Sequence, residues 1–273
     1  TVEDDVGRPV SIASRPVRVV SVGPSTTEAL FAMGVGDRLV GIDRFSNYPP
    51  ETADVEQVGG LVDPSIERIV SLRPDVVFMR DMAMQPGERL EALGLTVVVV
   101  GSEDIEGVFS SLKLFGWVLD ARSEADDVAA ALRARLADVA TALDGLAPED
   151  RITVFYELGH EPLYTAGPGS FVHEVITLAG GVNVAGDAHT AWTSYSVERL
   201  IQRDPEVVLV TVEESVDAIR EGRRAQWRSL RAVTSGRVHL IDGDAMNRPG
   251  PRLADAVESV ARLLYPDRFP EED

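Results

Sequence analysis

Several residue types and patterns are absent from this sequence, and each absence excludes a kind of chemistry or structure. Cysteine does not occur, which excludes disulfides, thiolate metal ligands and cysteine nucleophiles. No stretch approaches the roughly 18 uninterrupted apolar residues of a membrane-spanning helix, and the longest apolar runs, such as 96–100, are as short as a strand. The first residues, Thr1–Asp5, lack a starting methionine, a basic segment and an apolar signal core, so we expect that an export signal has been removed.

Basic residues are scarce, and lysine occurs once, at Lys113. The sequence carries 26 lysines and arginines against 45 aspartates and glutamates, a formal net charge of −19. A surface of that charge repels nucleic acids and anionic lipids, so we expect no nucleic-acid partner. With 44% hydrophobic residues, a chain of 273 residues has enough apolar material for one large core or two smaller ones.

Common catalytic signatures are absent as well. There is no Gly-x-Ser-x-Gly elbow, phosphate-binding loop, dinucleotide fingerprint or His-Glu-x-x-His motif. The four histidines are too scattered for a spaced metal motif, although His160 and Glu161 follow a predicted strand. We therefore expect a binding protein without catalytic residues, a metal site or a cofactor of its own.

The sequence contains an internal repeat. The segment Ile66–Met79 matches Val197–Val210, and five of the fourteen aligned positions are identical. Each copy predicts a short helix that stops before a proline, Pro74 or Pro205, because proline disfavours helical geometry in the residue before it. An apolar strand buried on both faces follows in each copy. The repeat therefore predicts two matched halves.

A weaker similarity pairs the segment 23–34 with the segment 167–181. Both segments predict a Gly-Pro turn, a helix and a glycine stop. Ser25 and Glu28 have the spacing of a capping box, in which each side chain bonds a free backbone amide at the helix start.

The segment between the two repeat copies predicts one long helix. Apolar residues recur there at helical spacing from Val128 to Leu143. At ~1.5 Å per residue, about 21 helical residues form a rod of roughly 30 Å. We interpret residues 123–145 as a connecting spine helix between an N-terminal lobe, 1–122, and a C-terminal lobe, 146–273. A stiff spine predicts small hinge motions.

Predicted strands alternate with helices in both lobes. The strands are expected near residues 17–22, 39–42, 75–78 and 95–100, and near 151–156, 162–165, 207–211 and 238–241. This alternation predicts an α/β fold of two Rossmann-like lobes, each with a central, mainly parallel sheet, and a ligand cleft between the lobes. Ligands of such sheets bind at the carboxyl ends of the strands.

The loops that follow these strands are rich in aromatic and arginine residues. Aromatic faces supply apolar contact area, and an arginine fork fixes carboxylate, phosphate or amide edges. The set predicts a site for a large, flat ligand, and its candidate residues are Tyr48, Arg80, Tyr164, Trp192, Asp244 and Arg248. Core or loop packing explains any single aromatic residue at least as well. A surface salt bridge explains Asp244 and Arg248, which are four residues apart, equally well.

Glu67 and Glu198 are the matched acidic residues of the repeat. An acid near the start of a helix is favourable for the helix itself. Symmetry offers a second interpretation, because one exposed carboxylate per lobe is suited to meet arginines on a two-fold symmetric membrane partner.

Taken together, these motifs resemble the rigid-spine class of solute-binding proteins that serve ATP-driven importers for vitamin B12, iron-siderophores and haem. The resemblance covers nearly the whole chain and rests on the paired Glu-Arg helices and on four further motifs, at residues 15–20, 23–28, 47–50 and 248–252. It implies a dimeric permease as partner, with Glu67 and Glu198 as the docking residues. It also implies an extracytoplasmic protein, periplasmic or anchored at the cell surface as a lipoprotein, and we expect a monomer.

Within that class the sequence is most similar to the vitamin B12-binding branch. Five candidates fall where that branch places corrin-contacting residues, namely Tyr48, Tyr164, Trp192, Asp244 and Arg248. The resemblance therefore implies a corrinoid ligand. Arg80 and Leu61 depart from the branch, which has tryptophans at these places, and Arg80 suits haem propionates or an acidic siderophore at least as well. A corrinoid, haem and a ferric siderophore all stay open, and a tetrapyrrole- or metal-processing enzyme and a free metal-ion binder rank lower.

Overall fold

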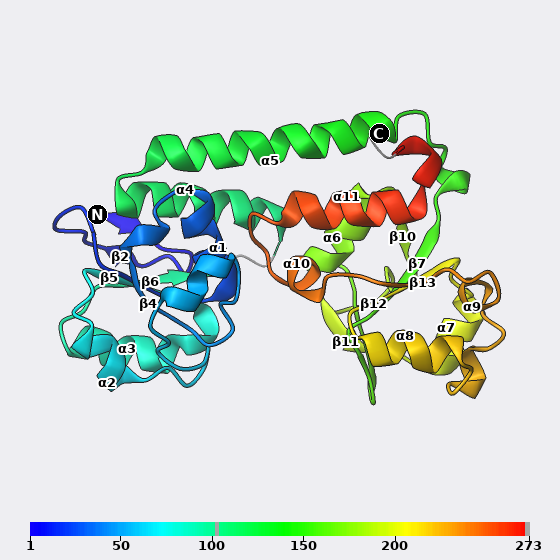
Figure 1. Cartoon of the computed structure of the whole chain (residues 1–273), viewed down its shortest axis with the longest axis horizontal. Coiled ribbons are helices and arrows are strands. Elements are labelled where there is room, and N and C mark those ends of the chain that lie inside the picture. The colour runs from blue at the N-terminus through cyan, green and yellow to red at the C-terminus, as the bar shows by residue number, and fades with distance from the viewer. Residues whose placement is uncertain (102–103, 271–273) are drawn as a thin grey trace. The chain divides into compact units, whose positions relative to one another are not determined.

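The computed structural model describes residues 1–101 and 104–270. The chain divides into two compact units: unit 1 is Thr1–Leu132 with Pro249–Pro251, and unit 2 is Arg133–Arg248 with Arg252–Asp273. Helix α5 (Arg122–Ala142) is one uninterrupted helix of 21 residues (Figure 1). The long helix predicted from the sequence is therefore present, whereas the lobe limits at 122 and 146 stay a prediction.

Unit 1 contains a four-stranded parallel sheet in the order β4-β3-β5-β6. Three of these strands, β3, β5 and β6, are rich in valine and almost entirely buried, as expected for a parallel sheet covered by helices. The strands are β3 (Val19–Val22), β4 (Leu39–Ile42), β5 (Val76–Arg80) and β6 (Val97–Val100). The helices are α1 (Pro24–Ala32), α2 (Ile66–Ser71), α3 (Met84–Ala92) and α4 (Ile105–Leu119). A short antiparallel ribbon, β1 (Val2–Glu3) with β2 (Pro9–Val10), precedes them.

Unit 2 contains a second four-stranded parallel sheet, in the order β10-β7-β12-β13. Its strands are β7 (Thr153–Glu157), β10 (Val182–Asn183), β12 (Val207–Val210) and β13 (Val238–Leu240). Its helices are α6 (Phe171–Leu178), α7 (Val197–Arg203), α8 (Glu213–Arg220), α9 (Arg231–Thr234), α10 (Gly243–Asn247) and α11 (Leu253–Leu264). In both sheets the second strand along the chain lies at the edge, followed by the first, third and fourth. The α/β prediction with mainly parallel sheets is confirmed.

One predicted strand of unit 2 lies in a different sheet. The segment expected at 162–165 forms β9 (Leu163–Ala166), which pairs antiparallel with β8 (Gly159–His160) and β11 (Trp192–Ser194). Only a few residues separate β7 from β9, whereas a parallel crossover needs a dozen or more. The chain therefore turns back as a hairpin, and β10, which the sequence pattern did not predict, is the fourth strand of the parallel sheet.

The capping box predicted for α1 is wrong. The helix begins at Pro24, its N-cap is Gly23, and no side chain bonds an amide at this helix start. Proline at the first helical position already lacks an N–H, so the helix starts one residue before the serine. Ser25 and Glu28 are buried inside the first turns instead.

The repeated helices α2 and α7 start and stop in the same way. Ser65 accepts a hydrogen bond from the amide of the third helical residue at 3.3 Å, and Ser196 accepts the matching bond at 3.0 Å. After the helices, Arg73 and Asp204 adopt left-handed backbone conformations, with φ of 47° and 42°. A proline follows each of them and prevents the helix from continuing. The sequence repeat is therefore also a repeat of local structure.

An acidic residue follows each of these prolines and binds the start of the neighbouring strand. The Asp75 carboxylate accepts from the amides of Val17 and Arg18 at 2.8 and 2.9 Å. The Glu206 carboxylate accepts from the amide and the hydroxyl of Thr153, both at 3.0 Å. In each unit this acid therefore links the start of the third strand of the parallel sheet to the start of the first strand.

A buried ion pair lies at the end of β7. Glu157 pairs with Arg224, which lies between α8 and α9, and their side chains are 3% and 7% exposed. Arg224 also donates to the Ser215 hydroxyl at 2.8 Å, and its guanidinium lies 5.0 Å from the centre of the Trp227 ring. The pair thus fixes the segment after α8 against the central strand of unit 2.

We expect Arg224→Met to destabilise unit 2 by about 3–5 kcal/mol, because it leaves the Glu157 carboxylate buried without a cation. The matched control is Arg223→Met, which removes an exposed pair with Glu221 at 2.8 Å and is expected to cost ~1 kcal/mol or less. Guanidinium unfolding, with hydrogen exchange of the β7 amides, measures both. Equal losses in the two variants would contradict a special role for the buried pair.

Candidate functional site

The two predicted site residues of unit 1 lie where strands of the parallel sheet end, which we call the carboxyl edge. Arg80 is the last residue of β5, and Tyr48 lies in the loop that follows β4. The register pairs Ser21 with Ile42 and with Phe78, so the three strands end at nearly the same level. The Tyr48 side chain is 44% exposed and Arg80 is half-buried. Both residues therefore lie at the edge where ligands of parallel α/β sheets commonly bind.

The side chain of Arg80 covers the turn after β3. A Cβ atom built at Gly23 would lie 3.3 Å from the Arg80 Cγ and 3.6 Å from its Cδ. A side chain at this position would push the arginine stem away. Glycine at position 23 therefore leaves room for the stem of Arg80 in its present position.

Asp43, which sequence reasoning missed, organises this edge. Its buried carboxylate accepts hydrogen bonds from the amides of Gly23 at 3.0 Å and Phe45 at 2.8 Å and from the hydroxyl of Ser46 at 2.6 Å. Burial raises the pKa of the Asp43 carboxyl, although the bonds from Ser46, Phe45 and Gly23 act to lower it. The only signal in the sequence is an acid directly after a buried strand. Asp43 joins the turn under Arg80 to the loop that carries Tyr48.

A second network links the first turns of α1 to the same loop. The Thr27 hydroxyl lies 2.9 Å from the Ser46 hydroxyl and donates to the Ser21 hydroxyl at 2.9 Å. All three side chains are buried. The threonine of the Gly-Pro-Ser-Thr-Thr motif therefore has a structural role in holding the loop.

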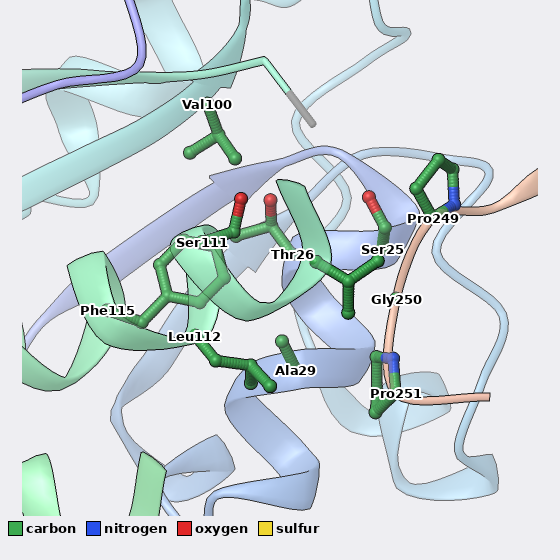
Figure 2. Close-up of a pocket in the computed structure, with 11 residues that line it drawn as sticks. Ser25, Thr26, Ala29, Val100, Ser111, Leu112, Phe115, Pro249, Gly250 and Pro251 are labelled. Carbon is green, nitrogen blue, oxygen red and sulfur yellow. The ribbon is translucent and has the colours of Figure 1, made fainter. Parts of the chain in front are cut away.

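A small pocket of unit 1 lies at the first turns of α1 (Figure 2). Side chains of α1 and α4 line it together with the segment Pro249–Pro251. A Cβ atom built at Gly250 would lie 3.3 Å from the Ser25 Cβ, so the segment packs closely on the helix. The cavity measures about 10 Å³, which is room for about one water molecule. We therefore interpret it as a packing gap and not as a ligand site.

The aromatic candidates of unit 2 share one face of the antiparallel sheet. Tyr164 on β9 pairs with Ser194 of β11, and Trp192 of β11 pairs with Ala166 of β9. Directly paired residues point to the same face, so Tyr164 and Trp192 are diagonal neighbours on that face. Trp192 is 39% exposed and Tyr164 is half-buried. Two aromatic rings are thus presented by a rigid, hydrogen-bonded pair of strands.

The charged candidates of unit 2 form an ion pair on the short helix α10. The Arg248 guanidinium lies 2.8 Å from the Asp244 carboxylate. Arg248 is the more buried partner, with 14% of its side chain exposed against 44% for Asp244. Asp242 caps the helix by accepting from the amides of Asp244 and Ala245, and it also accepts from the Arg252 guanidinium at 2.9 Å. The pair therefore sits on a helix whose start is fixed.

The end of α10 is also fixed, by residues that sequence reasoning missed. The hydroxyl of the fully buried Tyr156 donates to the Asn247 side-chain carbonyl at 2.9 Å. The Asn247 side-chain amide donates to the Gly243 carbonyl at 2.8 Å. Burial raises the pKa of the Tyr156 hydroxyl, which therefore keeps its proton and remains a donor.

The two repeated carboxylates occupy matching places. Glu67 and Glu198 are the second residues of α2 and α7, and both are exposed. Within the described ranges, neither side chain makes a hydrogen bond or an ion pair. The following arginines are engaged elsewhere: Arg68 donates to a backbone carbonyl at 2.9 Å, and Arg199 binds the Asp187 carboxylate at 2.6 Å. Both glutamates are thus available to a partner.

No group of three or more histidine, aspartate or glutamate side chains in residues 1–101 and 104–270 is arranged to hold a metal ion. In the same part of the chain, no helix combines the length and apolar character needed to cross a membrane.

Comparison with known proteins gives consistent similarities. A sequence model of the family described as periplasmic binding protein matches residues 19–245. The "Uncharacterized ABC transporter substrate-binding lipoprotein YvrC" of Bacillus subtilis is 30% identical over 99% of this chain and 87% of its own length. The vitamin B12-binding protein of Vibrio cholerae is 31% identical over 90% of this chain and 88% of its own length.

A solved structure has the same fold. The periplasmic heme-binding protein RhuT from Roseiflexus sp. RS-1, in its apo form, superposes with a TM-score of 0.81 and is 26% identical. The match covers 92% of this chain and 98% of that protein.

We expect Asp43→Asn to destabilise unit 1 by about 1–3 kcal/mol, because a side-chain amide offers no acceptor to one of the two amides. The folded state raises the Asp43 pKa above 3.8, so the folded protein holds this proton more tightly than the unfolded chain. The stabilisation that comes from this tighter proton binding is therefore fully present below pH 3.8 and is lost as the pH rises through the raised pKa of Asp43. The difference in free energy of unfolding between the wild type and the variant should therefore be largest at low pH and should decrease towards neutral pH.

Unfolding by denaturant at a series of pH values measures this difference. Asp54→Asn, at an exposed aspartate of the same unit, serves as the control and should leave the free energy of unfolding nearly unchanged. A gap that widens as the pH rises would show that Asp43 has a lowered pKa instead.

Proposed function

The chain belongs to the periplasmic binding protein family, and from this premise we propose that it captures a corrinoid of the vitamin B12 type and delivers it to an importer. Members of the family are solute-binding components of ABC transporters, not enzymes. We place the protein outside the cytoplasm, free in the periplasm or attached to the cell surface as a lipoprotein, and we expect it to act as a monomer.

The observation that carries the proposal is the similarity to the vitamin B12-binding protein of Vibrio cholerae, which extends over 90% of this chain. The face shared by Tyr164 and Trp192 supports it, because a corrin ring is large and flat and is well matched by aromatic surfaces. We propose that the ligand is bound by Tyr48, Arg80, Tyr164, Trp192, Asp244 and Arg248.

Haem or a ferric siderophore is the second candidate ligand, and Arg80 favours it. A guanidinium fork binds carboxylates in two-point contacts, and haem carries two propionates. The similarity to a heme-binding protein at 26% identity points the same way. Arg80 therefore serves to distinguish the two candidates by experiment.

Glu67 and Glu198 are proposed to dock the protein on the permease. The repeat places them at the same position of matching helices, each exposed and without an intramolecular partner in the described part of the chain. Equivalent carboxylates are suited to equivalent arginines on a dimeric permease. Their exposure also means that they contribute little to the fold.

We expect purified protein to bind cyanocobalamin saturably with one site, as measured by calorimetry and visible absorption. Trp192→Ala should weaken binding by about tenfold or more, because a large apolar contact is lost. Arg80→Gln should weaken cyanocobalamin binding only a few-fold, because a corrinoid offers this arginine no carboxylate pair, whereas a much larger loss of haemin affinity would indicate a propionate contact and haem as the ligand.

Trp117→Ala is the matched control, because this tryptophan is 49% exposed on α4, outside the proposed residues. Titrations with haemin and several ferric siderophores run in parallel. The proposed binding site would be refuted if none of the ligands bound, or if both tryptophan variants lost the same amount of ligand affinity.

We expect the double variant Glu67→Ala, Glu198→Ala to lose uptake in cells while its ligand affinity stays that of the wild type. The control is Glu106→Ala with Glu213→Ala, two exposed acids in the first turns of α4 and α8 that lie outside the repeat. Uptake measured with labelled ligand should be normal in the control pair. A loss of ligand affinity in the first pair would place these glutamates in the binding site instead.

A further inference from the structure

Unit 2 contains a second cavity, beside the edge strand β10 and distinct from the aromatic face. Its volume is about 530 Å³, within the range of roughly 300–1,000 Å³ that is typical of small-molecule sites. Residues of β7, β10, α6 and α7 contribute to its lining, and the polar ones include Arg151, Thr153, His173, Asn183, Asp187 and Arg203.

The matching place in unit 1 is closed by the chain itself. There the edge strand β4 is paired on its outer side, where Ile42 receives a hydrogen bond from Val58 at 2.8 Å and donates to Glu56 at 2.9 Å. In the described part of unit 2, no segment pairs with the outer side of β10. The two halves share a topology, but only the second leaves this edge open.

The buried side chain of Asn183 determines which ring nitrogen of His173 carries the proton that faces the cavity. The Asn183 side-chain amide donates to the Ala166 carbonyl at 2.7 Å, and its carbonyl accepts from the Ala185 amide at 3.0 Å. Its second N–H faces the His173 Nδ1 at 3.2 Å, so Nδ1 accepts and the ring proton lies on Nε2. Burial lowers the His173 pKa and favours this neutral form. The Nε2–H has no partner among the described residues.

The cavity is cationic although the chain carries a net charge of −19. Among the described lining residues, Arg151 and Arg203 are the two arginines and Asp187 is the one carboxylate, which Arg203 shares with Arg199 from outside the lining. Arg151 is exposed, and in the described ranges its side chain has no partner. The cavity therefore offers arginine and imidazole donors with a surplus of positive charge.

We propose that this cavity is an accessory site for a small solute that carries a phosphate or carboxylate group. Arg151 and the His173 Nε2–H donate to the oxyanion, and Arg203 supplies further positive charge. The site is independent of the proposed corrinoid site, because its residues and its ligand chemistry are different. The accessory site would bind an anion beside helix α7, the helix on which Glu198 lies.

The test is calorimetric titration of the full chain with inorganic phosphate, glycerol 3-phosphate and citrate, at constant ionic strength in sodium chloride. At least one probe should bind saturably with one site, and comparison of the three distinguishes free phosphate, a phosphomonoester and a polycarboxylate. Arg151→Gln and His173→Asn should each weaken that binding by about tenfold, as expected for loss of a charge-assisted or a buried hydrogen bond.

Arg223→Gln is the matched control, because this exposed arginine of unit 2 lies outside the cavity. Its affinity should equal that of the wild type. The proposal is overturned if no probe binds saturably, if either cavity variant keeps wild-type affinity, or if all three variants lose affinity equally. Circular dichroism of each variant verifies that it is folded.

Discussion

The constraint on which both units depend is the join between the repeated helix and the strand that follows it. In each unit a proline ends the helix, and the next residue, Asp75 or Glu206, binds the backbone at the entry to the first strand. The acid therefore fixes where the third strand of the sheet starts relative to the first. Because these two strands pair in parallel register, they also end at the same level. The loops that are proposed to contact a ligand start from the same level because the strands end together.

The two units share this join and the same sheet order but differ in their loops. Unit 1 holds its edge with a buried carboxylate, Asp43, beneath the loop that carries Tyr48. Unit 2 has instead an added antiparallel sheet and the fixed helix α10, which present aromatic rings and an ion pair. In both units the presenting elements are fixed by buried hydrogen bonds, which reduces the entropy lost when a ligand binds.

The sequence was sufficient for those features that depend on local pattern. The repeat, the buried strands, the long helix and the placement of Arg80 at a strand end follow from periodicity and proline positions. The antiparallel pairing of β9 was missed because a short apolar run is equally suited to either kind of sheet. The bond between Asp43 and Gly23 and the bond between Tyr156 and Asn247 were missed because these partners lie 20 and 91 residues apart in sequence. The capping box failed because Pro24 had already determined where the helix starts.

The repeated glutamates occupy a position that fits their proposed docking role. A helix that precedes a parallel strand runs back across the sheet, so its first turn lies towards the carboxyl edge. Glu67 and Glu198 stand in these first turns, on the same side of each sheet as the loops that are proposed to hold the ligand. The loops of the two units differ, whereas both helix starts have a serine cap and a glutamate. That contrast is expected if the ligand is a single asymmetric molecule and the partner is two-fold symmetric, because only the partner then requires the two halves to stay alike.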